Sequence, residues 1–303
     1  MKAYFVSKYK RPMQVGEVAE PAIDDRDVLV DVHAAGVNML DAKIRDGEFK
    51  LFLPYKAPFI LGHDLAGVVT RVGSAVTRFT VGDEVYARPR DGRIGTFAER
   101  IAVDEDDLAI KPANLSMAEA ASVPLVALTA WQALVERANL QPGRKVLVHA
   151  GSGGVGAYAI QLAKHLGATV TTTTGTSNLE WVRDLGADVV IDYRTQDFET
   201  VAHDYDIVLD SQGGDTLAKS LRVLKPGGTA IGIAGPPDPD FARQQGLRLP
   251  LRLAMTALSL KTRRAARRQG VRYSFLFMRA SGAQLDEITK LIETNVLRPI
   301  LDR

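Results

Sequence analysis

The sequence contains no cysteine among its 303 residues. Disulfide bonds, zinc sites with thiolate ligands and thiol nucleophiles are therefore excluded. No apolar run approaches the length of about 20 residues that crosses a membrane, and residues 1–10 lack the apolar block of a signal peptide. These absences predict a cytoplasmic protein without a membrane span.

Acidic residues are missing from one long stretch. Residues 241–272 contain nine basic residues and no acidic one, whereas the rest of the chain carries 29 basic and 36 acidic residues. Pro250 suits the first position of a helix, and Leu251, Met255 and Leu258 recur on one side of it. We expect an exposed basic helical insertion whose apolar side packs on its own domain. Contact with a second copy of the chain and binding to RNA or to an anionic membrane surface are the alternatives.

The length of the chain and a change of pattern along it indicate two domains. The first hundred residues are β-rich, with strands expected at 28–37, 66–73 and 81–87. A helical stretch follows, beginning at a capping box of Ser116 and Glu119. From Lys145 onward, short apolar strands alternate with amphipathic helices, which predicts an α/β fold with a doubly wound parallel sheet.

A glycine-rich loop follows the first of these strands. The loop reads HAGSGGVG, and Gly151, Gly153 and Gly156 match the pattern G-x-G-x-x-G. Because a strand precedes the loop and a helix follows it, the pattern predicts a dinucleotide site formed by Gly151, Ser152, Gly153, Gly154, Val155 and Gly156. Glycines let a pyrophosphate approach the backbone, and the helix N-terminus offers unpaired N–H groups.

The end of the next strand favours NADP(H) over NAD(H). NAD enzymes place an acidic residue about 20 residues past the glycines, where it binds the ribose 2′-hydroxyl. This sequence has no acidic residue between Gly156 and Glu180, and we assign Glu180 to a capping box with Ser177. Thr174, Gly175 and Ser177 instead offer hydroxyl and N–H groups to a 2′-phosphate.

Several motifs in order along both parts of the chain resemble one family. They are GVNMLDAKIRDG, PFILGHDLAGVV, VLVHAGSGGVGAYAIQLAKHLGA, LGADVVIDYR, VLDSQGG, LKPGGTAIGIAG and YSFLFMRASGAQL. The chain resembles the zinc-independent quinone oxidoreductases and enone reductases among the medium-chain dehydrogenases/reductases.

The resemblance implies two domains with the active site in the cleft between them, and a homodimer. Residues 1–121 with 273–303 would form a GroES-like β-barrel catalytic domain, and residues 122–272 a Rossmann-type NADP(H) domain carrying the basic insertion. His63 and Asp64 keep the shape of the family's G-H-E motif, but without cysteine no metal site is expected. Relatives continue beyond NVLRPILDR with a helix and a strand, so an unpaired barrel edge is expected.

The resemblance also implies individual site residues. Asn38 and Thr129 would contact the substrate and the nicotinamide. The further cofactor residues are Tyr193, Ser211, Gln212, Ile233, Ala234, Phe275 and Phe277. Each of these two residues has a purely structural alternative role. Asn38 could form an Asx turn, and the Thr129 hydroxyl could donate to a carbonyl of its own helix.

The implied reaction is hydride transfer from NADPH to a quinone or to the carbon–carbon double bond of an α,β-unsaturated carbonyl. Such acceptors take hydride at carbon and delocalise the charge, so a few hydrogen-bond donors can replace a zinc ion. An NADPH-binding nucleic-acid or regulatory protein with incidental reductase activity is the alternative, although nucleic acid is not expected as a partner.

Overall fold

The computed structural model describes residues 1–301, and the chain divides into two compact units. Unit 1 contains Met1–Leu128 and the segment from Arg279 onward, and unit 2 is Thr129–Met278. The boundaries differ from the expected 1–121 with 273–303 and 122–272. Unit 2 ends at Met278 and not at residue 272, because Arg272–Phe275 forms a strand, β14, that pairs in the sheet of unit 2.

Unit 1 is built from two antiparallel sheets that an isolated bridge between Ala3 and Ala98 connects. The sheet orders are β2(Gln14–Glu17)-β1(Lys2–Val6)-β4(Phe59–Ile60) and β7(Arg100–Asp104)-β3(Asp27–Gly36)-β5(Asp64–Val72)-β6(Glu84–Ala87)-β8(Leu108–Ile110). Apolar side chains of the second sheet, such as Val28, Val69 and Val85, form a core. The helices are α1(Met39–Arg45), α2(Met117–Ala121), α3(Pro124–Trp131), whose last residues lie in unit 2, and α10(Gly282–Glu293), with the 3-10 turn η1(Glu105–Asp107).

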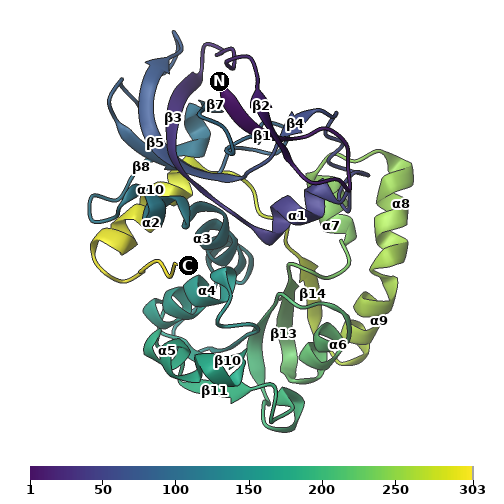
Figure 1. Cartoon of the computed structure of the whole chain (residues 1–303). Coiled ribbons are helices and arrows are strands. Elements are labelled where there is room, and N and C mark those ends of the chain that lie inside the picture. The colour runs from purple at the N-terminus through teal and green to yellow at the C-terminus, as the bar shows by residue number, and fades with distance from the viewer. Residues whose placement is uncertain (302–303) are drawn as a thin grey trace. The chain divides into compact units, whose positions relative to one another are not determined.

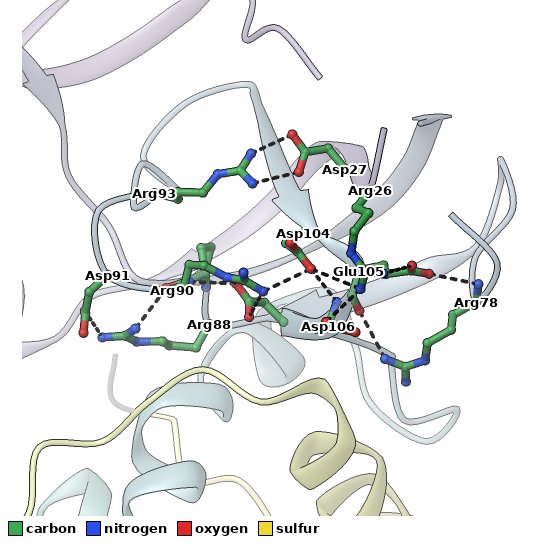
Figure 2. A network of polar contacts seen from close by, with 12 residues as sticks. Arg26, Asp27, Arg78, Arg88, Arg90, Asp91, Arg93, Asp104, Glu105 and Asp106 are labelled. Carbon is green, nitrogen blue, oxygen red and sulfur yellow. Dashed lines mark hydrogen bonds and ion pairs between the residues drawn. The ribbon is translucent and has the colours of Figure 1, made fainter. Parts of the chain in front are cut away.

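A network of arginines and acidic side chains stabilises one end of the larger sheet in unit 1 (Figure 2). Arg93 binds the buried Asp27 through two nitrogens, at 2.8 and 2.6 Å. Arg90 binds Asp107 in the same forked manner, at 2.8 and 3.0 Å. Forked guanidinium–carboxylate pairs fix geometry as well as charge. They therefore hold the loop after β6 against the start of β3 and against the turn η1 after β7.

Unit 2 contains a six-stranded parallel sheet in the order β11-β10-β9-β12-β13-β14. Its strands β13 and β14 lie side by side in Figure 1. The strands are β9(Lys145–Val148), β10(Thr169–Thr174), β11(Val189–Asp192), β12(Tyr205–Asp210), β13(Leu224–Gly232) and β14(Arg272–Phe275). In chain order this is 3-2-1-4-5-6, the doubly wound order of dinucleotide-binding sheets, which confirms the predicted fold class.

Helices and short helical turns complete unit 2. They are η2(Gln132–Arg137), α4(Gly154–His165), η3(Thr176–Asn178), α5(Leu179–Asp184), η4(Phe198–Thr200), α6(Gly214–Arg222), α7(Pro239–Gln244), α8(Leu249–Leu258) and α9(Leu260–Arg268). Helices α4 and α5 pack on β9–β11, while α6 packs on β12 and β13, and α9 on β14.

Three local predictions have different outcomes. The capping box of Ser116 and Glu119 is confirmed, because each side chain accepts the other's backbone N–H. The one predicted for Ser177 and Glu180 is wrong: Ser177 lies in η3, and α5 begins after Asn178 without a side-chain cap. The apolar side of the basic segment packs inward at Met255, but Leu258 is 61% exposed.

Candidate functional site

Strand register brings most of the predicted cofactor residues of unit 2 to one edge of the sheet. Val148 at the end of β9 pairs with Thr172 of β10 and with Leu209 of β12. Asp210 in turn pairs with Gly232 of β13, and Gly232 with Phe275 of β14. The segments that follow these strands are therefore neighbours at the carboxyl edge, where such sheets bind ligands.

The glycine loop is shaped by close backbone contacts. A Cβ on Gly156 would lie 2.2 Å from the carbonyl oxygen of Ala150, and one on Gly151 would lie 2.3 Å from the hydroxyl of Thr172. Gly153 is different: it is exposed, is the N-cap of α4, and its Cβ would approach no atom closer than 3.3 Å. Gly151 and Gly156 are therefore required by the packing of the loop itself. Gly153 is not, and because it has no side chain it leaves the N-terminus of α4 accessible to a ligand.

The helix that begins at this loop has N–H groups to offer. Gly154 and Val155 form its first turn, Ser152 lies half-buried before it, and the turn contains no acidic side chain. The unpaired N–H groups and the helix dipole favour an anion here. The residues present therefore fit a dinucleotide pyrophosphate.

The loop after β10 carries the groups expected for the adenosine end. Thr174 is buried, and its hydroxyl has no partner among residues 1–301. The Cβ position of Gly175 faces the hydroxyl of Tyr193 and Nε of Arg194, each at 3.4 Å. Tyr193 is 60% exposed and donates its N–H to the carbonyl of Thr174. Ser177 lies exposed in η3.

A buried chain of hydrogen bonds connects the glycine loop to the loop after β12. The N–H of Ala150 donates to the Thr173 hydroxyl, which is 3.1 Å from Nδ1 of His149. Nε2 of His149 is 2.9 Å from the Ser220 hydroxyl, which donates to Asp210 at 3.0 Å. We place the His149 proton on Nε2, because Nδ1 then accepts from Thr173 and every pair has one donor.

The same series of hydrogen bonds fixes the loop after β12. Asp210 Oδ1 accepts the N–H groups of Gln212 at 3.0 Å and Gly213 at 2.6 Å. Burial raises the pKa of Asp210 and lowers the pKa of His149 to about 4, so His149 is neutral at pH 7. Both loops are thereby held in place before any ligand binds.

Four of the predicted cofactor residues, Ser211, Gln212, Ile233 and Ala234, lie in these edge loops. The Ser211 hydroxyl donates to the carbonyl of His149 at 3.3 Å and accepts from the Gln212 amide. Ile233 donates its N–H to the carbonyl of Asp210. The carbonyl oxygen of Ala234 would lie 2.7 Å from a Cβ on Gly213, so the two loops are in close contact.

The two predicted phenylalanines each contact the ring of Phe241 in unit 2. Phe275 is buried and meets Phe241 edge-on at 5.1 Å between ring centroids, and Phe277 lies 5.8 Å from the same ring. Asp238 joins the two segments by accepting the N–H groups of Phe241 and Phe275, at 2.8 and 2.9 Å. Phe277 is half-buried, whereas Phe275 is buried.

In unit 1, two acidic side chains hold Asn38 before α1. Asp41 accepts its backbone N–H at 2.8 Å, and Asp64 accepts its side-chain amide at 2.9 Å. Asp41 also contacts Nδ1 of His63 at 2.6 Å, and Asp64 accepts the N–H of Leu125 at 2.9 Å. Asn38 is half-buried and keeps one amide hydrogen that these bonds do not use.

Burial raises the pKa of Asp64 to about 8, against the smaller opposing effects of the Asn38 and Leu125 hydrogen bonds. Burial therefore favours the neutral form of Asp64 well above the pH at which a free aspartate ionises. Thr129 lies buried in α3. Nε2 of His63 is buried without a partner among residues 1–301. The described part of the chain contains no group of three His, Asp or Glu side chains that could hold a metal ion.

Several residues of these sites were not predicted. Asp210 at the end of β12 and Ser220 in α6 form the hydrogen-bond chain with His149, Arg194 follows β11, and Asp64 binds Asn38. Asp210 carried a signal in the sequence, because it ends the apolar run of β12 directly before Ser-Gln-Gly. Ser220 carried none, since its partner His149 is 71 residues away.

Two family models match the chain. The alcohol dehydrogenase GroES-like domain matches residues 24–113, and the zinc-binding dehydrogenase domain matches residues 185–303. The NADPH-dependent alkenal/one oxidoreductase of Arabidopsis thaliana chloroplasts is 42% identical, over 75% of this chain and 60% of the relative. The mitochondrial NAD(P)H oxidoreductase RTN4IP1 of Mus musculus is 35% identical, over 91% and 75%.

The structural comparison agrees. The quinone oxidoreductase of Coxiella burnetii superposes with a TM-score of 0.85 at 30% identity, over 98% of this chain and 89% of that one. The chain belongs to the medium-chain dehydrogenase/reductase superfamily. Within it, the chain belongs with the quinone oxidoreductases and enone reductases, which confirms the resemblance. It spans about three fifths of the length of two plant relatives to which it is 42–43% identical.

No helix among residues 1–301 combines the length and the apolar character that crossing a membrane requires.

Proposed function

We propose that the protein is an NADPH-dependent oxidoreductase that reduces quinones or the carbon–carbon double bond of α,β-unsaturated carbonyls. The observation that carries the proposal is the glycine loop at the carboxyl edge of the parallel sheet, with Gly153 leaving the N-terminus of α4 open. The relatives' names, alkenal/one and quinone oxidoreductases, support the substrate class.

The cofactor would be held by unit 2 in three places. Residues 151–156 would bind the pyrophosphate, and Ser211, Gln212, Ile233 and Ala234 would line the nicotinamide end. At the adenosine end, the guanidinium of Arg194 and the hydroxyls of Tyr193 and Ser177 suit a 2′-phosphate. Residues 174–178 contain no acidic side chain to favour a free 2′-hydroxyl, which supports a preference for NADP(H).

NADPH supplies a hydride, and the chain's own groups supply position and charge stabilisation. Asn38 would donate its remaining amide hydrogen to the substrate oxygen, on which negative charge develops. Asp64 accepts the other amide hydrogen and Asp41 accepts the backbone N–H of Asn38, which would orient the amide before the substrate binds. Thr129 would contact the nicotinamide. Phe277 would cover the site with apolar surface.

Steady-state oxidation of NADPH and NADH with a panel of quinones and enones tests the proposal, with and without a chelator. We expect turnover that prefers NADPH and is unaffected by the chelator. Turnover that the chelator abolishes would contradict zinc independence. NADPH binding without turnover on any acceptor would favour a binding or regulatory role.

We also propose that the protein works as a cytoplasmic homodimer. The family resemblance supports the dimer, and the composition supports the location. Sedimentation velocity at several protein concentrations tests the first part: a single monomeric species throughout would contradict it.

A further inference from the structure

Helix α8 presents apolar side chains to solvent. Leu249 and Leu253 are 65% and 62% exposed, and with Ala257 they are spaced four residues apart on one side of the helix. Leu258 at the end of α8 is also exposed. The opposite side is covered, since Met255 and Ser259 are buried. Soluble proteins rarely leave a continuous apolar strip uncovered unless it binds something.

Positive charges lie beside the strip on α8 and beyond its end on α9. Arg248 and Arg252 flank it on α8, and α9 continues from α8 through Ser259 (Figure 1). The basic residues of α9 are Lys261, Arg263, Arg264, Arg267 and Arg268. No side chain among residues 1–301 forms an ion pair with any of these seven residues.

The arrangement of these charges is unfavourable in isolation. Arg263 and Arg267, like Arg264 and Arg268, are like-charged pairs one helical turn apart. A partner with negative charge would relieve this repulsion. We call the strip and the seven basic residues, 248–268, the α8–α9 surface.

Three partners can be compared by their chemistry. A second copy meeting this surface face to face would bring the two sets of positive charge together. A nucleic acid would match the charge but leave the exposed leucines in water. An anionic lipid surface matches both features, because amphipathic helices place leucines at the acyl boundary and basic side chains among the headgroups.

We propose that the α8–α9 surface docks the protein reversibly on anionic lipid bilayers, with Leu249 and Leu253 entering the interface and the basic residues binding headgroups. The helices lie on the bilayer and do not cross it. This inference does not depend on the proposed reductase activity. A docked reductase would, however, meet apolar quinones and enones where they concentrate.

Co-sedimentation with vesicles tests the proposal on the full chain. The vesicles contain phosphatidylcholine alone, or phosphatidylcholine and phosphatidylglycerol in equal parts. We expect binding to the anionic vesicles that is at least about tenfold tighter than to the neutral ones and that weakens with salt. Equal binding to both kinds, or binding to neither, would overturn the proposal.

Two variants separate charge from apolar contact. One carries Arg263→Gln, Arg264→Gln, Arg267→Gln and Arg268→Gln, and the other carries Leu249→Ser and Leu253→Ser. Each should lose most of its binding to anionic vesicles. Matched controls carry Lys8→Gln, Arg11→Gln, Lys56→Gln and Arg183→Gln, or Val15→Ser and Val81→Ser, which are 62% and 65% exposed. The controls should bind as the unmodified protein does.

The outcomes against the proposal are distinct. If the controls lose binding as much as the test variants, another surface docks. If only the charge variant loses binding, the leucines do not enter the bilayer and a polyanion is the better partner. If the leucine variant changes a dimer into a monomer and vesicle binding is unaffected, the strip is a contact between copies.

The absence of cysteine permits a direct check of insertion. Leu253→Cys gives a single attachment point for an environment-sensitive fluorophore, and Val15→Cys gives its control. We expect a blue shift of emission with anionic vesicles at position 253 and none at position 15. No shift at position 253, with binding intact, would refute insertion of α8.

Discussion

Replacing Gly153 by alanine adds one methyl group and should weaken cofactor binding while leaving the fold intact. Its backbone lies in the extended region (φ −84°, ψ 162°), which alanine adopts without strain. A Cβ there would meet only the carbonyl oxygen of Ala150, at 3.3 Å. Gly153→Ala should therefore change the free energy of unfolding by less than about 1 kcal/mol.

Cofactor binding should respond far more strongly. The new methyl group would occupy the space above the first turn of α4, where a pyrophosphate must approach the backbone. Losing one or two hydrogen bonds to a charged group costs about 3 kcal/mol, which corresponds to about a hundredfold weaker Kd for NADPH.

Gly156→Ala is the matched comparison within the same loop. Its Cβ would lie 2.2 Å from the Ala150 oxygen and 2.8 Å from the Cα of Gly151, so backbone must move and the protein should lose stability. Thermal unfolding measures the stability of both variants, and titration calorimetry measures NADPH affinity. A Gly153→Ala protein with normal stability and undiminished NADPH binding would refute the assignment of the loop.

Three further predictions follow from the buried groups and from Arg194. Because burial raises the pKa of Asp64 from its ordinary value near 4 to about 8, the contribution of its neutral carboxyl group to stability is fully present below pH 4 and is lost as the pH rises to 8. Asp64→Asn should remove up to about 4 kcal/mol of this pH dependence between pH 5 and 8; urea unfolding that shows a pH-independent difference between the two proteins would contradict it. Ser220→Ala removes the hydroxyl that His149 and Asp210 share, so the free energy of unfolding should fall by about 1–3 kcal/mol and NADPH binding should weaken. Ser211 is half-exposed, and Ser211→Ala should lower the free energy of unfolding by less than about 1 kcal/mol. Arg194→Gln should raise the KM for NADPH about tenfold and leave the KM for NADH unchanged. The control is Arg183→Gln, at an exposed arginine. Equal effects on both cofactors would argue against a contact between Arg194 and the 2′-phosphate.

Local patterns determined what could be predicted. The loop of Gly151, Gly153 and Gly156 was predictable because strand, loop and helix are contiguous in the sequence. The boundary of unit 2 was not, since Tyr273–Phe275 belongs to an apolar run that alone does not tell a strand of the parallel sheet from a segment of the other domain.

Contacts between distant segments determined what could not be predicted. His149 and Ser220 meet only because β9 and β12 are neighbours, and Asp64 meets the N–H of Leu125 across 61 residues. Helical spacing in α8 showed that the helix is amphipathic but not which leucines the protein covers. Met255 packs inward, whereas Leu249, Leu253 and Leu258 stay exposed.

The most direct test of the central claim is the fate of the hydride. The protein is incubated with an α,β-unsaturated ketone and NADPH deuterated at the transferable position of nicotinamide C4, and the product is analysed by mass spectrometry and NMR. The proposed reaction places one deuterium on the β-carbon of a saturated ketone. Deuterium on the carbinol carbon of an allylic alcohol, or no labelled product with any acceptor of the panel, would contradict it.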